Sequence, residues 1–122
     1  MAQGVVLCPH CGHHSEYDKF HAGFGNQGYM YCDSDCTLVT WSAFDSRFVR
    51  LVGSKHSWML NNDERKLVEE SILDCPCGGR FTFNSNPRCP KCNCELPQTP
   101  SDSIYFLILG MRIDGEKQSV WK

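Results

Sequence analysis

The sequence predicts a small α+β fold in which bound metal ions hold two short β units together. The first observation is that the chain has 122 residues and nine cysteines, eight of which lie in close pairs. The second is that patterns typical of short strands alternate with patterns typical of one or two short helices. A chain of this length buries a modest apolar core, and scaffolds of this size usually need covalent or metal staples.

The cysteines are predicted to bind metal, not to form disulfides. The odd number of cysteines and their close spacing favour metal ligation. Met1 is followed by neither a basic segment nor a long apolar segment, so no secretory signal is expected. The longest apolar run, Ile104 to Leu109, is too short to span a bilayer. These observations together predict a cytoplasmic protein without a membrane partner.

Four cysteine pairs supply the predicted ligands of two metal ions. We expect the first site to consist of Cys8, Cys11, Cys32 and Cys36. We expect the second site to consist of Cys75, Cys77, Cys89 and Cys92.

Two ligand assignments stay open. The spacing leaves Cys94 over, either as an inert thiol or as a replacement for Cys89 or Cys92. Cys36 follows Cys32 after three intervening residues and precedes Thr37 where a glycine is usual, so a histidine is the alternative ligand there. The candidate histidines are His10, His13, His14 and His21.

The cysteine motifs resemble those of the zinc-ribbon class, which is built from rubredoxin-like knuckles. The motifs are Cys8-Pro9-His10-Cys11-Gly12, Cys75-Pro76-Cys77-Gly78-Gly79 and Cys89-Pro90-Lys91-Cys92-Asn93. The resemblance covers residues 8–36 and 75–92, and it implies two tetrahedral thiolate-bound zinc ions within knuckle–hairpin–knuckle units. Gly12 and Asn93 stand where a knuckle needs a left-handed backbone conformation, which both residue types tolerate.

Short strands are predicted around these motifs. The first three, at residues 5–7, 15–20 and 29–31, surround the first knuckle and a glycine-rich turn at 21–28. Residues 37–41 are rich in β-branched and aromatic side chains, and residues 80–83 alternate. A longer apolar strand is expected at 103–113, and Asp114-Gly115 predicts a hairpin that returns to Trp121.

Two helices are predicted between the cysteine motifs. Residues 43–52 carry apolar side chains at helical spacing, from Phe44 to Val52, with Ser42 as a capping residue and Gly53 as the stop. Residues 61–73 form the clearest helix, with Asn61 as N-cap and Glu64 three residues later. Its expected buried face is Leu67, Val68, Ser71 and Ile72.

The chain is therefore expected to form a single compact domain, residues 1–122, with two zinc-binding subdomains. The first ribbon would comprise residues 1–53. The helix, the second ribbon and the C-terminal hairpin would comprise residues 54–122.

The predicted function is a non-catalytic zinc-binding protein that acts through protein–protein interaction, as an adaptor or as an inhibitor of the immunity type. Two saturated thiolate sites leave no open position for water or substrate, so an enzyme is not expected. The net charge of −2 and pI near 6.2 disfavour the first alternative, a nucleic-acid-binding ribbon. The second alternative is a redox or metal-handling protein that uses Cys94.

Overall fold

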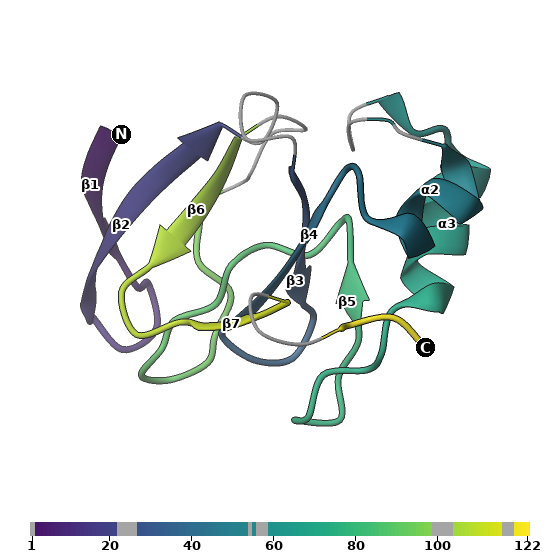
Figure 1. Ribbon diagram of the computed structural model, residues 1–122. Coiled ribbons are helices and arrows are strands. Elements are labelled where there is room, and N and C mark those ends of the chain that lie inside the picture. Colours follow the sequence, from purple (N-terminus) through teal and green to yellow (C-terminus); the bar gives the residue numbers. More distant parts are fainter. Residues whose placement is uncertain (1, 22–26, 54, 56–58, 99–103, 116–118) are drawn as a thin grey trace.

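The computed structural model describes residues 2–21, 27–53, 55, 59–98, 104–115 and 119–122. Within this part of the chain there are seven strands and two helices, with the strands packed at one side of the helices (Figure 1). The predicted fold class is confirmed: the protein is a small, mostly stranded α+β structure with two cysteine clusters and a C-terminal strand–turn–strand unit.

The first sheet has three antiparallel strands in the order β1-β2-β6. These strands are β1 (Ala2–Leu7), β2 (His14–His21) and β6 (Ile104–Ile108). Val6 and Cys8 are buried, whereas Val5 and Leu7 are exposed. This period of two shows that one face of β1 is covered and the other faces solvent. At the other edge of the sheet, Tyr105 and Phe106 of β6 are both buried, so β6 is covered on both faces.

The second sheet has four strands in the order β5-β3-β4-β7. They are β5 (Phe81–Thr82), β3 (Gln27–Cys32), β4 (Thr37–Ser42) and β7 (Arg112–Asp114), and β7 runs parallel to β4. Successive residues of β3 belong to different cores, Met30 on the helix side and Tyr31 on the side of the first sheet. The central strands β3 and β4 are therefore buried on both faces, which explains their nearly continuous runs of buried residues.

The two helices cover the outer face of the second sheet. The first helix, α2 (Ser46–Val52), begins later than predicted, because its N-cap is Asp45, whose carboxylate accepts from the backbone N–H groups of Arg47 and Phe48. Phe44 consequently precedes the helix and is 67% exposed, contrary to prediction. Gly53 ends the helix as predicted, with φ of 81°.

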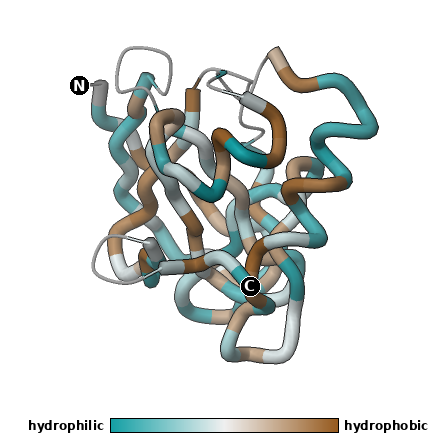
Figure 2. Tube along the Cα trace, turned by 45° about the vertical axis from the view of Figure 1, so that its right-hand side comes forward, coloured by the Kyte–Doolittle hydropathy of each residue, from teal (hydrophilic) through white to brown (hydrophobic). Residues whose placement is uncertain are grey.

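The second helix, α3 (Asn62–Ser71), has the predicted capping box between Asn61 and Glu64. Val68 and Ile72 enter the core, whereas Leu67 is 41% exposed. Figure 2 shows hydrophobic and hydrophilic segments alternating along the chain, as half-buried elements require. No helix in the described ranges is long and apolar enough to cross a membrane.

The C-terminal segment joins the two sheets. The strand predicted at 103–113 is interrupted at Gly110, which has φ of 92°, so that β6 lies in the first sheet and β7 in the second. Trp121 then forms an isolated bridge with Ile72 beside the helices. Residues 116–118 of the predicted return, most of the glycine-rich turn and Trp58 lie outside the described residues.

Candidate metal centres

Two groups of four potential ligands lie within the described structure. Cluster A consists of Cys8, Cys11, Cys89 and Cys92. Cluster B consists of Cys32, Asp35, Cys75 and Cys77. In each cluster the four ligand atoms all lie within 4.8 Å of one another, so each cluster could hold one metal ion.

Cluster A is built from two knuckles with the same backbone hydrogen bonds. The Cys8 N–H donates to the carbonyl of His13 at 2.9 Å, and the Gly12 N–H donates to the carbonyl of Cys8 at 3.0 Å. In the other knuckle, Cys89 donates to Cys94 at 2.8 Å and Asn93 donates to Cys89 at 2.9 Å. The cluster therefore joins two equivalent turns from opposite ends of the sequence.

The left-handed residues of these knuckles confirm the prediction from sequence. Gly12 has φ of 74°, and Asn93 has φ of 67°, the only positive φ of a non-glycine residue in the described ranges. Asparagine adopts this left-handed conformation at low energetic cost because its short polar side chain can form hydrogen bonds with nearby groups. The Lys91 N–H also donates to the Cys89 Sγ at 3.4 Å, which directs a backbone dipole at the sulfur.

Cluster B combines the end of β3 with a tight Cys75–Cys77 turn. The turn closes through Gly78, which has φ of 95° and donates to the Cys75 carbonyl at 2.9 Å. Backbone N–H groups again face sulfurs, from Ser34 to Cys32 and from Gly79 to Cys77, both at 3.3 Å.

The pairing of cysteine motifs differs from the one expected. The Cys8–Cys11 knuckle meets Cys89–Cys92, not Cys32–Cys36, and Cys75–Cys77 meets Cys32, not Cys89–Cys92. The strands explain the difference, because β3 pairs with β5 and sets Cys32 opposite Phe81, close to the Cys75–Cys77 turn. Each cluster thus takes two ligands from residues 1–53 and two from residues 54–122, so neither expected subdomain holds a complete cluster.

The fourth member of cluster B is Asp35, where the expected ligand was Cys36. The Asp35 Oδ1 accepts from the Cys75 Sγ at 3.5 Å, whereas the half-buried Cys36 belongs to neither cluster. Cys32-Asp33-Ser34-Asp35 has two intervening residues, the same spacing as Cys8 and Cys11. That spacing was the sequence signal for Asp35, which an assignment limited to cysteine and histidine ligands leaves out.

The remaining candidates lie outside both clusters. Cys94 is left over, and its carbonyl oxygen accepts the knuckle hydrogen bond from Cys89. None of the four candidate histidines belongs to a cluster within the described ranges. Burial raises the pKa of the Cys36 thiol to about 12, which favours its neutral form.

Local electrostatics distinguish the members of the clusters. The backbone N–H of Cys11 lowers the pKa of the Cys8 thiol to about 6. Burial raises the pKa of Cys32 and Cys75, and it opposes ionisation of Asp35, whose pKa is nevertheless held below its usual value by hydrogen bonds from Thr37 and the cluster thiols. A bound cation would reverse the effect of burial on the thiols, because it favours the thiolate.

An arginine lies directly beside cluster B. The Arg112 Nη2 donates to the Cys75 Sγ at 3.3 Å and forms an ion pair with the Asp114 carboxylate at 3.2 Å. The Arg112 backbone N–H donates to the carbonyl of Cys36 at 3.1 Å, which holds the start of β7 next to the residue that follows Asp35. With a metal ion bound, the guanidinium would offset part of the negative charge that three thiolates and a carboxylate would bring together.

The two clusters are also connected to each other. The Asn93 side-chain amide donates to the Ser34 carbonyl at 2.6 Å. The Cys89–Cys92 knuckle of cluster A therefore contacts the segment between Cys32 and Asp35 of cluster B. Arg88 in turn donates to the Asn93 carbonyl at 3.0 Å.

Comparison with known protein families gives a match over most of the chain. A family described as Domain of unknown function (DUF8255) matches residues 4–98, a range that contains all the residues of both clusters. No curated protein and no solved structure matches the chain.

Proposed function

We propose that this chain, which belongs to the DUF8255 family, is a non-catalytic zinc protein that acts by binding another protein. Each cluster would hold one zinc ion as a structural staple. The surface around the staples would then serve as an adaptor or an inhibitor.

The sulfur geometry is the observation that carries the zinc assignment. The Sγ–Sγ distances are 3.4 Å for Cys8–Cys92, 3.7 Å for Cys11–Cys89 and 3.5 Å for Cys32–Cys77. A tetrahedral site with Zn–S bonds of about 2.3 Å places its sulfurs about 3.8 Å apart, whereas a disulfide needs about 2.05 Å. Thiolates select zinc among the common ions that have no redox chemistry, and a carboxylate is also an accepted ligand.

The number of protein ligands supports a structural role. Catalytic zinc sites keep one position for water or substrate, whereas structural sites are closed by four protein ligands. Both clusters offer four. Zinc at these sites would therefore contribute stability and leave function to the surface.

The staples also suit the topology. Cys8 and Cys92 are 84 residues apart in the sequence, and Cys32 and Cys77 are 45 residues apart, so cluster B lies inside the loop that cluster A closes. Binding an ion at each site ties distant segments together, and the binding free energy adds directly to folding.

Elemental analysis tests the zinc assignment. Folded protein purified without chelators is expected to contain two zinc ions per chain, and removal of the zinc is expected to unfold it. Folded, cooperatively melting protein that contains no zinc would contradict the proposal.

A further inference from the structure

We propose that the open edge of β1 and the exposed face of the first sheet bind an extended, basic segment of the partner protein. This inference rests on the proposed protein-binding function and names the surface and the chemistry of its partner.

The first feature of this surface is the free edge of β1. Within the described ranges β1 pairs only with β2, so one edge of β1 has no neighbouring strand. The Cys8 N–H donates to the carbonyl of His13, which directly precedes β2, so Cys8 directs its N–H group toward the β2 side. Alternate residues of an antiparallel strand direct their backbone groups to the same edge. Gln3, Val5 and Leu7 consequently direct their N–H and C=O groups to the free edge.

The sequence of β1 offers no protection against strand addition. Ala2–Leu7 contains no proline and no charged residue, which are the usual devices that block a free edge. An extended peptide could therefore add to this edge through main-chain hydrogen bonds, a recurring mode of peptide recognition.

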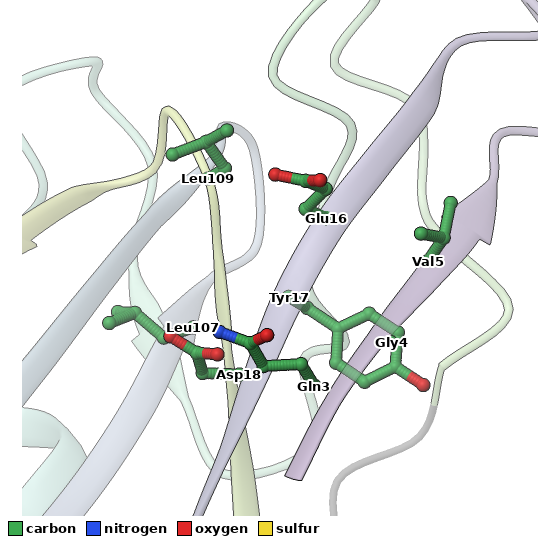
Figure 3. A pocket seen from close by; sticks show the side chains of 8 residues that line it. All are labelled: Gln3, Gly4, Val5, Glu16, Tyr17, Asp18, Leu107 and Leu109. Carbon is green, nitrogen blue, oxygen red and sulfur yellow. The ribbon is translucent and has the colours of Figure 1, made fainter. Parts of the chain in front are cut away.

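The second feature is the exposed apolar face beside that edge. Val5 is 61% exposed, Leu7 55% and Leu109 69%. Figure 3 shows Leu109, Glu16 and Val5 in one row across the strands, with Leu107, Asp18 and Gln3 in the next. These residues border an open groove of about 480 Å³. On the opposite face the Tyr17 ring packs so closely over Gly4 that an added Cβ would lie 2.5 Å from its hydroxyl oxygen.

The third feature is the negative charge of this face. Glu16 and Asp18 stand among the apolar side chains of this face, and the ion pairs of the described structure lie elsewhere, at Lys55–Glu64 and Arg112–Asp114. The neighbouring Lys19 is directed to the other face, where its Nζ lies 5.8 Å from the centre of the Phe106 ring.

These three features specify the occupant. In an added strand, alternate side chains point to the face that carries Val5 and Leu7. Lysine or arginine at those positions would pack its stem on the exposed apolar side chains and reach Glu16 and Asp18 with its charged end. A second copy of this chain would bring an uncharged β1 and the same carboxylates, so it offers no complementary charge.

A peptide-binding experiment tests the inference. The probe is an end-blocked peptide of alternating lysine and valine, seven residues long, and the control peptide has glutamate in place of lysine. Amide chemical shifts of the zinc-loaded protein are expected to change most at Gln3, Val5 and Leu7 with the lysine peptide, and not with the glutamate peptide.

Matched variants test the role of charge. Glu16→Gln combined with Asp18→Asn is expected to weaken binding about tenfold, because two charge pairs are lost. Asp63→Asn combined with Glu70→Gln removes the same charge from α3, on the far side of the molecule, and is expected to leave binding unchanged (Figure 1). Val5→Pro, which removes a donor from the free edge, is expected to abolish the shift changes at β1.

Each of four outcomes would overturn the inference. They are no binding of the lysine peptide at millimolar concentration, equal binding of both peptides, equal weakening by both double variants, or a concentration-dependent dimer formed through β1. The zinc content of the same samples separates the two proposals. Protein with two zinc ions that ignores the peptide would refute this inference alone, whereas folded protein without zinc would refute the zinc assignment.

Discussion

The hydroxyl of Tyr31 makes two hydrogen bonds to the backbone of Phe106, donating to its carbonyl oxygen and accepting from its N–H, both at 2.7 Å. Tyr31 lies on β3 and Phe106 on β6. One side chain of the second sheet therefore provides hydrogen-bond partners for the backbone N–H and C=O groups at the edge of the first sheet. Tyr29 adds a hydrogen bond to the carbonyl of Ile104 at 3.2 Å. Two tyrosines thus take the place of a neighbouring strand for β6.

Replacing Tyr31 with phenylalanine is expected to lower the free energy of unfolding by about 1–3 kcal/mol, because a buried N–H and a buried carbonyl lose their partner. Urea unfolding of the zinc-loaded protein measures this. Burial raises the pKa of Tyr31, so the hydroxyl stays protonated and the effect is expected to be constant from pH 6 to 9. Tyr17→Phe is the control, because the Tyr17 hydroxyl has no hydrogen bond in the described ranges, and it is expected to cost less than about 0.5 kcal/mol.

Cys32 and Cys36 provide a matched pair of serine substitutions for testing cluster B. Cys32→Ser removes a cluster thiolate and is expected to reduce the zinc content to one ion per chain. Cys36→Ser alters a thiol outside both clusters and is expected to leave two ions bound. Elemental analysis of both proteins shows which of the two cysteines is a zinc ligand. A Cys36→Ser protein that holds a single zinc ion would show that Cys36, as first expected from the sequence, is a ligand.

Local features of this fold were predictable from the sequence, and long-range ones were not. The capping box of Asn61 and Glu64, the stop at Gly53 and the left-handed Asn93 all depend on neighbours within a few residues, which the sequence displays directly. The meeting of Cys8 with Cys92 depends on which strands pair, and four similar cysteine pairs are compatible with more than one combination. Asp35 offers a carboxylate at a position where cysteine and histidine motifs alone indicate no ligand.

Glu64 is expected to stabilise the protein in a pH-dependent way. The hydrogen bond from Lys55, followed by that from the Asn61 backbone, holds the pKa of Glu64 below its usual value. A carboxyl group whose pKa is lower in the folded protein than in the unfolded chain raises the free energy of unfolding. Its contribution is complete above the pKa of the unfolded chain and is lost as the pH falls through the pKa of the folded protein. Glu64→Ala is therefore expected to destabilise the protein most near pH 7, and progressively less below about pH 4.5.

The control for this prediction lies on the same helix. Glu70 is exposed and belongs to no ion pair in the described ranges. Glu70→Ala is expected to shift the urea midpoint only slightly. A Glu64→Ala effect that did not shrink on acidification would show that side-chain packing, not charge, is responsible.

Arg112 is expected to tune the metal affinity of cluster B only. Its guanidinium contacts the Cys75 sulfur, and groups that hydrogen-bond to metal ligands typically change affinity 10–100-fold when removed. Arg112→Ala is expected to weaken zinc binding at one of the two sites by about that factor, measured by competition with a chelator. Arg50→Ala, at the exposed end of α2, removes the same charge and is expected to leave both affinities unchanged. Equal weakening of both sites by Arg112→Ala would indicate a general loss of stability instead.

Cluster B is expected to release its zinc before cluster A, because a carboxylate holds zinc less strongly than the soft thiolate that stands at the equivalent position of cluster A. Transfer of zinc to a chromophoric chelator is expected to show two phases, with the faster one absent in Cys32→Ser. Asp35→Cys completes a four-thiolate site at the same spacing and is expected to slow the faster phase about tenfold or more, without changing the slower phase. Asp35→Ala leaves three ligands in cluster B and is expected to accelerate the faster phase. If Asp35→Cys left the faster phase unchanged, the carboxylate would not be a ligand, and cluster B would be a three-thiolate site with its fourth position open.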